Sequence, residues 1–458
     1  MRKIVSFAVA LLTALAAALF LFTGRAPGPT IAILSPADAV GAATPMQIAI
    51  DAPGAKLSAV RITFEQNGTS TELFTLGADP ARSGVTMTVE PPDRVRLARQ
   101  VGRASIPGIT AGPARLRVTA TRPTFMGLRH ATSEASRDLQ VRLEPPRVSV
   151  VSIHHYINVG GSEMAVYRAS PADVDSGVRV GDQEFPGYPA AGARADPGAP
   201  TDPELRVAFF ALDWDRPVGT PIVVFARDAT GAIAETRLES KVFPKPFKKS
   251  RIDLNDDFLG RVVPAILAGT TEVAPSGTLV EKFVVINGEL RRKNAETIRG
   301  FAVKTDPTML WKGDVFFPFT NSKAESAFAD ARTYIYQGRE VDHQVHLGFD
   351  LASFAQTAVV SSNRGRVLFA DNFGIYGNCV ILDHGMGVQS LYAHLSVIDV
   401  KPGDMVEKAQ PLGKTGITGL AGGDHLHFTM LVNGHMVNPV EWWDPHWIAD
   451  RIVRKLRD

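Results

Sequence analysis

Short runs in which apolar and polar residues alternate recur between Thr30 and about Ser240, and glycine, proline and asparagine separate them. Alternation points successive side chains to opposite faces of a strand, so each run is typical of a half-buried β-strand. Regular short strands with turn residues between them favour β-sandwiches. We therefore predict two Ig-like β-sandwich modules, over residues 28–145 and 146–242. The runs are Thr30–Leu34, Gln47–Ile50, Val60–Phe64, Gly84–Val89, Arg115–Ala120 and Leu139–Leu143 in the first module, and Arg147–Ser152, Leu205–Phe210 and Ile222–Phe225 in the second.

Two stretches of the second module have the composition of turns. Asp228-Ala-Thr-Gly231 separates Ile222–Phe225 from the run Glu235–Leu238 and predicts a hairpin. Pro186–Pro203 is rich in proline, alanine and glycine and predicts a long loop.

An apolar run opens the chain. Arg2 and Lys3 precede nineteen uncharged residues, Ile4–Phe22, a length near that of a membrane span. The residues that follow Phe22 provide no clear cleavage site. We expect residues 1–27 to form an uncleaved signal anchor that attaches the protein to a membrane, with a cleaved signal peptide as the alternative. Either segment would export the rest of the chain.

Helical periodicity appears in the segment 243–310. A basic linker, Pro244–Ser250, leads into three stretches in which apolar residues recur at about every 3.6 positions. This mixed segment is expected to pack beside the C-terminal domain or to space it from the membrane. The three stretches are Asp253–Leu259, Leu279–Ile286 and Asn294–Ile298.

The pattern returns to short strands in residues 311–445, where most connections are short and contain glycine. This favours an antiparallel β domain. Trp442, Trp443 and Trp447 follow the last expected strand and are expected in its core. Residues 446–458 continue as an amphipathic C-terminal helix. The fold class is therefore mainly β, with an N-terminal anchor, two sandwiches, a mixed helical linker and a C-terminal antiparallel β domain.

Composition narrows the possible functions. A chain of 458 residues suggests roughly three domains, and its hydrophobic fraction of 45% is that of a globular protein. The net charge of +2 argues against a nucleic-acid partner. The single cysteine, Cys379, excludes an internal disulfide and lies in the apolar run Cys379–Leu382, which indicates a buried thiol.

Candidate metal ligands gather near the C-terminus, where eight of the eleven histidines lie at or beyond His343. On a strand, Leu426, Phe428 and Met430 would face a core, while His425 and His427 would share the opposite face with Thr429. One of these two imidazoles could bind a metal while the other lies beside it. Two surface histidines on an ordinary strand would give the same pattern.

An earlier motif favours a metal site over two ordinary surface histidines. His346 and Asp350 are four residues apart, but Gly348 between them disfavours a helix. A straight strand would separate them by about 13 Å, whereas a turn at Gly348 could bring both to one ion. Catalytic zinc takes three protein ligands and a water. His346, Asp350 and one histidine of the later pair form such a set, and the other histidine and His394 remain as bases near the metal.

The ordered phrases His346-Leu-Gly-Phe-Asp350, Tyr392-Ala-His394-Leu395 and Gly423-Asp-His-Leu-His-Phe428 resemble the lysostaphin/LytM-type zinc metallopeptidases of peptidase family M23. The similarity covers about Trp311 to Pro445, and no motif position departs from the pattern. The resemblance implies one Zn²⁺ per chain, held by the set His346, Asp350 and His427. It implies that His394 and His425 are the catalytic histidines, and that the substrate is the peptide of peptidoglycan cross-links.

The predicted function is therefore a zinc endopeptidase of the cell envelope, anchored in the inner membrane and facing the periplasm, or exported after signal cleavage. The alternative is a non-catalytic envelope scaffold that binds peptidoglycan or activates a partner hydrolase. A third interpretation is a zinc hydrolase that acts on a protein or a small molecule. The sandwiches could inhibit the enzyme or dock a regulatory protein.

Overall fold

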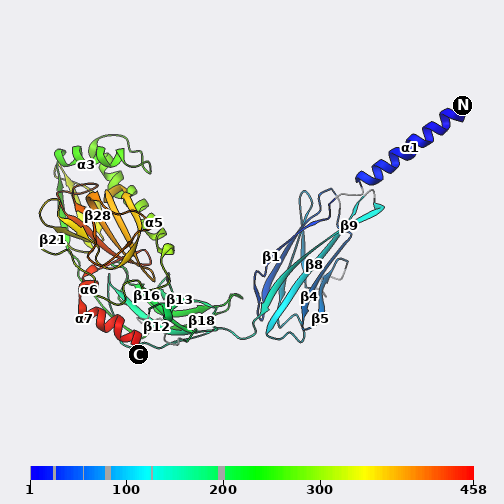
Figure 1. The fold of residues 1–458 in the computed structure, drawn as a ribbon, viewed down its shortest axis with the longest axis horizontal. Coiled ribbons are helices and arrows are strands. Elements are labelled where there is room, and N and C mark those ends of the chain that lie inside the picture. The colour runs from blue at the N-terminus through cyan, green and yellow to red at the C-terminus, as the bar shows by residue number, and fades with distance from the viewer. Residues whose placement is uncertain are drawn as a thin grey trace. The chain divides into compact units, whose positions relative to one another are not determined.

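The fold is that of a computed structural model, which describes residues 2–23, 27–54, 56–77, 84–124, 127–193 and 202–457. By internal contacts the chain divides into two compact units (Figure 1). One comprises Met1–Pro145 with Arg227–Ile233, and the other comprises Pro146–Ala226 with Ala234–Asp458. The predicted domain boundaries within these units remain predictions.

The N-terminal apolar run forms helix α1 (Arg2–Thr23). No helix among the described residues has the length and apolar character that crossing a membrane requires. The expected membrane anchor is thus not shown, and it remains a prediction.

The first unit contains a β-sandwich, as the alternating runs predicted. Strand β8 (Gly112–Thr124) alternates buried and less buried residues along its length, and its buried residues Leu116, Val118 and Ala120 pack in the core between two sheets. The sheets have the orders β1-β3-β7-β6 and β2-β9-β8-β4-β5. The other strands are β1 (Thr30–Ser35), β2 (Ala39–Val40), β3 (Thr44–Asp51), β4 (Ala59–Gln66), β5 (Thr69–Thr75), β6 (Thr86–Glu90), β7 (Arg94–Val101) and β9 (Arg129–Val141).

The second run of strands forms three sheets, with the orders β10-β12-β16-β15, β14-β13-β17-β18 and β11-β19. β17 and β18 are neighbours, which confirms the predicted hairpin. Part of the predicted loop Pro186–Pro203, residues 194–201, lies outside the described residues. The strands are β10 (Arg147–Val150), β11 (His155–Asn158), β12 (Ser162–Ser170), β13 (Asp175–Val180), β14 (Gln183–Pro186), β15 (Tyr188–Pro189), β16 (Leu205–Ala211), β17 (Ile222–Arg227), β18 (Ile233–Arg237) and β19 (Ser240–Phe243).

The predicted helical segment begins later than expected. Lys249–Leu254 is strand β20, which pairs in parallel with β22 (Asp330–Tyr336), so Asp253 belongs to a strand and not to a helix. Asn255 then caps α3 (Asp256–Ala268) by accepting a hydrogen bond from the amide of Phe258. A capping box formed by Thr278 and Glu281 starts α4 (Leu279–Val285), which continues through η3 (Ile286–Leu290) into α5 (Arg291–Gly300).

The C-terminal β domain contains a ten-stranded sheet with the central order β21-β24-β31-β28-β27-β26-β29, and its pairs are antiparallel, as predicted. A second sheet of three strands has the order β20-β22-β23, and β23 comprises Arg339–His346. The sheet strands are β21 (Lys323–Ser326), β24 (Phe349–Ala352), β25 (Ala358–Val360), β26 (Gly365–Asn372), β27 (Asn378–Gly385), β28 (Val388–Ile398), β29 (Met405–Val406), β30 (Pro411–Thr415), β31 (Leu426–Val432) and β32 (His435–Val437).

Both faces of the large sheet are covered, which explains its nearly continuous apolar runs. Residues such as Phe428 and Met430 pack in one core together with strands of the preceding sheets, such as β12 and β16. Residues whose side chains point to the other face of the sheet, such as Leu391 and Leu431, pack in another core with α3, α4 and α5. The helical segment therefore packs on one face of the sheet (Figure 1), and the register places His427 and Thr429 on that same face.

The chain ends in the expected helical stretch, formed by α6 (Pro439–Trp443), α7 (Pro445–Ile448), the π-helical η6 (Ala449–Val453) and α8 (Arg454–Arg457). Trp442 is fully buried, and Trp443 and Trp447 pack against the same core, as predicted. Cys379 is buried too.

Candidate metal centre

Three strands bring the predicted ligands together. His346 ends β23, and the chain then turns into β24, which carries Asp350. In the register of β24 and β31, Asp350 is the direct partner of His427, and side chains of paired residues share a face of the sheet. The cross-strand pair and the preceding turn therefore point all three side chains to one place.

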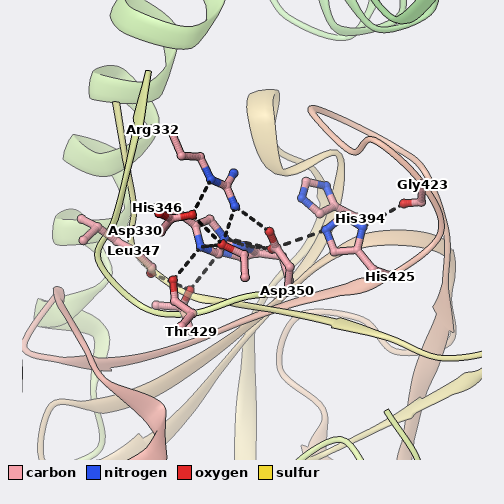
Figure 2. Close-up of polar contacts among 12 residues, drawn as sticks. Asp330, Arg332, His346, Leu347, Asp350, His394, Gly423, His425 and Thr429 are labelled. Atoms are coloured by element: carbon pink, nitrogen blue, oxygen red, sulfur yellow. Dashed lines mark hydrogen bonds and ion pairs between the residues drawn. The ribbon is translucent and has the colours of Figure 1, made fainter. Parts of the chain in front are cut away.

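The three ligand-type atoms form a small triangle (Figure 2). His346 Nε2 lies 2.9 Å from Asp350 Oδ1 and 2.9 Å from His427 Nδ1, and His427 Nδ1 lies 3.0 Å from Asp350 Oδ1. Zinc bonds of about 2.0–2.2 Å to such atoms put tetrahedral ligands a little over 3 Å apart. The described residues thus contain a donor set that fits a catalytic zinc site.

Hydrogen bonds on the far side of each imidazole orient it. The Thr429 hydroxyl donates to the carbonyl oxygen of Leu347 at 3.0 Å, so it accepts from Nε2 of His427, also at 3.0 Å. Nδ1 of His346 lies 3.2 Å from the carbonyl oxygen of Ala327, which can only accept. Each ring therefore carries its proton on the far nitrogen and presents the lone pair of the other nitrogen to the metal position.

Asp350 is held in the ionised state that a metal ligand needs. Its second oxygen, Oδ2, accepts a hydrogen bond from Arg332 at 2.9 Å, which leaves Oδ1 for the metal (Figure 2). Burial opposes ionisation, but the neighbouring imidazoles of His346, His425 and His427 outweigh it and hold the pKa of Asp350 well below its usual value.

Gly348 is required by close approach. A Cβ atom at this position would lie 2.5 Å from both Cε1 and Nε2 of His427 and 2.5 Å from the Thr429 hydroxyl oxygen. Any side chain here would displace the His427 ring.

His394 reaches the site through an irregularity in its strand. Pairing between β27 and β28 shifts register beside it, and the residue has a φ of +63°, which is uncommon for a non-glycine residue and is often found at functional sites. Nδ1 donates to the carbonyl oxygen of Thr418 at 2.8 Å, and Nε2 has no hydrogen-bond partner among the described residues. Burial, with the neighbouring His425 and His427, lowers the pKa of His394 well below its usual value.

His425 lies just before β31, at a bridge to Gly416. Its Nδ1 donates to the carbonyl oxygen of Gly423 at 2.8 Å, and its Nε2 lies 3.4 Å from Asp350 Oδ1. Burial opposes protonation of this ring, but the hydrogen bond and charge of Asp350 outweigh it and raise the pKa of His425. The His425 and His394 rings are 4.8 Å apart, so two unligated imidazoles lie side by side next to the triangle (Figure 2).

The backbone acceptors of both imidazoles belong to one loop, which α3 holds in place. Arg261 on α3 donates through Nη2 to the carbonyl oxygen of Ala421 at 2.8 Å, and it is within 3.5 Å of the carbonyl oxygens of Ile417 and Gly422. Ile417–Gly423 includes the carbonyl partners of His394 and His425. The helical segment therefore supports the site directly.

A pocket of about 100 Å³ is lined by all five predicted site residues. It is also lined by Arg332, Arg291 and Tyr376, none of which the sequence analysis singled out. The strand alternation had already placed Thr429 on the same face as His427. Nothing local marks Arg332, Arg261 or Arg291, because their proximity depends on how separate elements pack.

Comparison with known proteins supports the resemblance to peptidase family M23. Residues 344–439 match the model of peptidase family M23. The chain is 40% identical over 97 residues to the DD-carboxypeptidase/endopeptidase Mpg of Neisseria meningitidis serogroup B, and 38% identical over 96 residues to the peptidoglycan DD-endopeptidase ShyA of Vibrio cholerae serotype O1. Each match covers 21% of this chain and 22% of the relative, so the curated relatives are matched over about a fifth of their length.

The structure of the catalytic domain of lysostaphin from Staphylococcus simulans is 27% identical, with a TM-score of 0.23, and the match covers 27% of this chain and 92% of that domain. The matched region of this chain contains His346, Asp350 and His427, and their ligand-type atoms lie close to one another. Residues 344–439 are therefore a catalytic domain of peptidase family M23.

Proposed function

We propose that the protein is a zinc-dependent endopeptidase that hydrolyses peptide cross-links of peptidoglycan in the cell envelope. The observation that carries this proposal is the convergence of His346, Asp350 and His427 within hydrogen-bond distance of one another, beside two imidazoles that belong to no ligand set. Three ligands with adjacent free bases suit a hydrolytic metal site better than a closed structural one.

One zinc ion per chain would be held by Nε2 of His346, Oδ1 of Asp350 and Nδ1 of His427. Bound there, zinc supplies Lewis-acid polarisation of the scissile carbonyl and a water of lowered pKa. The protein fixes the three ligand atoms in advance, because Thr429, the Ala327 carbonyl and Arg332 orient them from behind.

His394 and His425 provide the proton transfers. Their Nδ1 protons are engaged with backbone carbonyls, so the Nε2 atom of each ring is the one that can exchange a proton with the reactants. One imidazole takes a proton from the attacking water, while the other stabilises the developing oxyanion or gives a proton to the leaving amine. Both arrangements are compatible with the geometry.

Peptidoglycan is proposed as the substrate because two relatives of the matched region carry names for such activity, a DD-carboxypeptidase/endopeptidase and a peptidoglycan DD-endopeptidase. The apolar N-terminal run supports export to the envelope, where this substrate lies. The complete ligand set argues against the alternative of a scaffold without catalytic activity.

The test is digestion of purified peptidoglycan by the purified full-length protein, with zinc and with a chelator, followed by mass analysis of the fragments. We expect soluble fragments whose masses correspond to cleaved peptide cross-links, and no fragments with the chelator. Zinc-loaded protein that binds peptidoglycan without cutting it would contradict the proposal and favour the scaffold. Cleavage of proteins but not of peptidoglycan would favour the third interpretation.

A further inference from the structure

The residue Arg291, at the start of α5, borders three hollows around the metal centre. It lines the small pocket that contains the metal ligands. It also lines a groove of about 290 Å³ that extends from Asp350 toward α3 and a groove of about 450 Å³ that runs past Leu347. Arg332 lines the same three hollows. Both arginines therefore lie where the pocket and the two grooves meet.

The two arginines differ in how their charges are neutralised. Arg332 lies 2.9 Å from Asp350 Oδ2 and 3.6 Å from Asp330 Oδ2, so its charge is balanced by carboxylates of the protein. Among the described residues, no carboxylate oxygen lies within 4.0 Å of Arg291, and its hydrogen bonds go to one uncharged residue, Asn287. A positive charge without an acidic partner therefore remains at the edge of the pocket.

One edge of the Arg291 guanidinium is fixed and the other is free. Nε donates to the backbone oxygen of Asn287 at 3.0 Å, and Nη2 donates to Oδ1 of the same residue at 2.6 Å. Asn287 is fully buried and is itself held by a bond from Nδ2 to Asp342 at 2.7 Å. The second proton of Nη2 and both protons of Nη1 remain, and one proton on each of these two nitrogens forms the planar fork that matches the two oxygens of a carboxylate.

A neutral hydrogen-bond donor lies nearby. Tyr376 lines the same pocket as Arg291, and its ring packs against His427 with 5.6 Å between ring centres. Two arginines and one aspartate line this pocket, and the excess of positive charge favours an anionic group.

We propose that Arg291 is a specificity-determining residue that binds a carboxylate of the peptide substrate next to the bond that is cut. This inference rests on the proposed function and deepens it, because it restricts the substrates to peptides with a free carboxylate near the scissile bond. The carboxylate is either the C-terminal group of the peptide or a carboxylate on a side chain. A charge-assisted bidentate bond distinguishes such a substrate from its uncharged amide, which cannot accept both hydrogen bonds of the fork.

The test compares matched cross-linked peptides prepared from peptidoglycan, in which the C-terminal carboxylate, the side-chain carboxylate or neither is converted to the amide. For zinc-loaded full-length protein, we expect kcat/KM to fall about 10–100-fold when the carboxylate that contacts Arg291 is amidated, the size of a hydrogen bond to a charged group. The peptide whose amidation causes the loss identifies the source of the carboxylate.

Variants separate recognition from a structural role. In Arg291→Gln the ratio of kcat/KM between acid and amide peptides should fall to near one, and Arg291→Lys should restore part of it. Arg299→Gln changes an exposed arginine on the same helix and should leave the ratio as in the wild type. Zinc content should be the same in all four proteins.

Three results would overturn the inference. Equal cleavage of all peptides by the wild type would show that no carboxylate is recognised. An equal loss on acid and amide peptides in Arg291→Gln would show that the residue acts only on the fold or on the chemistry. If the zinc-loaded wild type cleaves none of the peptides, the proposed function itself fails, and this inference fails with it.

Discussion

At the scale of single residues, the metal centre depends on the groups behind the ligands. Thr429 relays a hydrogen bond from His427 to the Leu347 carbonyl, and this relay determines which nitrogen of the ring faces the metal position. Arg332 donates a hydrogen bond to one oxygen of Asp350, so only the other oxygen is left for the metal. Such outer groups commonly change metal affinity by about 10–100-fold.

We therefore expect Thr429→Val to weaken zinc binding by about 10–100-fold, because valine preserves the shape but gives His427 no acceptor for its Nε2 proton. Thr429→Ser keeps the hydroxyl and serves as the matched control, with near wild-type affinity. The measurement is competition for zinc with a chelator of known affinity. Equal affinities of the valine and serine variants would show that the hydroxyl does not orient the ligand.

The histidines and Asp350 could be predicted from the sequence because their types and order are distinctive and strand alternation places His427 with Thr429. Gly348 could be predicted as a turn. Its second role, leaving room for the His427 ring, depends on the pairing of β24 with β31, which a single sequence does not reveal. Arg332 and Arg291 have no local pattern at all.

At the scale of elements, two features position His394 and His425. The register shift between β27 and β28 accompanies the left-handed backbone of His394, and helix α3 holds the loop whose carbonyls orient both rings. The helical segment was predicted to pack beside the catalytic domain or to space it from the membrane, and packing is what the structure shows. Its first expected helix was wrong at Asp253 because pairing with β22 outweighs local helical periodicity.

We expect Arg261→Gln to lower kcat by about 10–100-fold while zinc content stays unchanged, because glutamine cannot bridge the carbonyls of the Ile417–Gly423 loop, and small errors in position are costly in catalysis. Arg251→Gln is the matched control, since Arg251 is exposed on β20 and pairs only with Asp253 among the contacts described. Parallel assays of zinc content and peptide hydrolysis provide the check. A loss of zinc in Arg261→Gln would mean that the loop supports the ligands instead.

At the scale of the whole molecule, the sheets that contain β12 and β16 belong to one compact unit with the ten-stranded sheet and share a hydrophobic core with it. Buried polar contacts join them. Glu441 on α6 accepts hydrogen bonds from the Asn158 side chain at 2.8 Å and from the Ser162 amide at 2.9 Å, and buried Lys455 pairs with Glu163 at 2.8 Å. Alternating sequence patterns predicted the two sets of strands, but not that they would form one unit, because that depends on long-range contacts.

These contacts predict a pH dependence of stability. Burial raises the pKa of Glu441 from 4.5 to about 7, so the folded state binds this proton more tightly than the unfolded state does. The stabilisation is complete below pH 4.5 and is lost as the pH rises through 7, a change on the order of 3 kcal/mol. In Glu441→Gln this part of the pH dependence should disappear.

The measurement is urea unfolding of the wild type and Glu441→Gln between pH 5 and pH 8, where we expect the variant to become the relatively more stable protein as the pH rises. Glu296→Gln, which alters an exposed carboxylate on α5, should follow the wild type. Identical pH profiles for all three proteins would show that Glu441 titrates normally.

The account as a whole depends on the division of the five site residues into three metal ligands and two unligated bases. Zinc content measured together with the rate of peptidoglycan hydrolysis, for alanine variants of all five, tests this division most directly. His346→Ala, Asp350→Ala and His427→Ala should lose zinc and activity together. His394→Ala and His425→Ala should keep zinc while the rate falls by about 10²–10⁴-fold. Loss of zinc in His425→Ala with retention in His427→Ala would reverse the assignment, and full activity in all five variants would contradict the account.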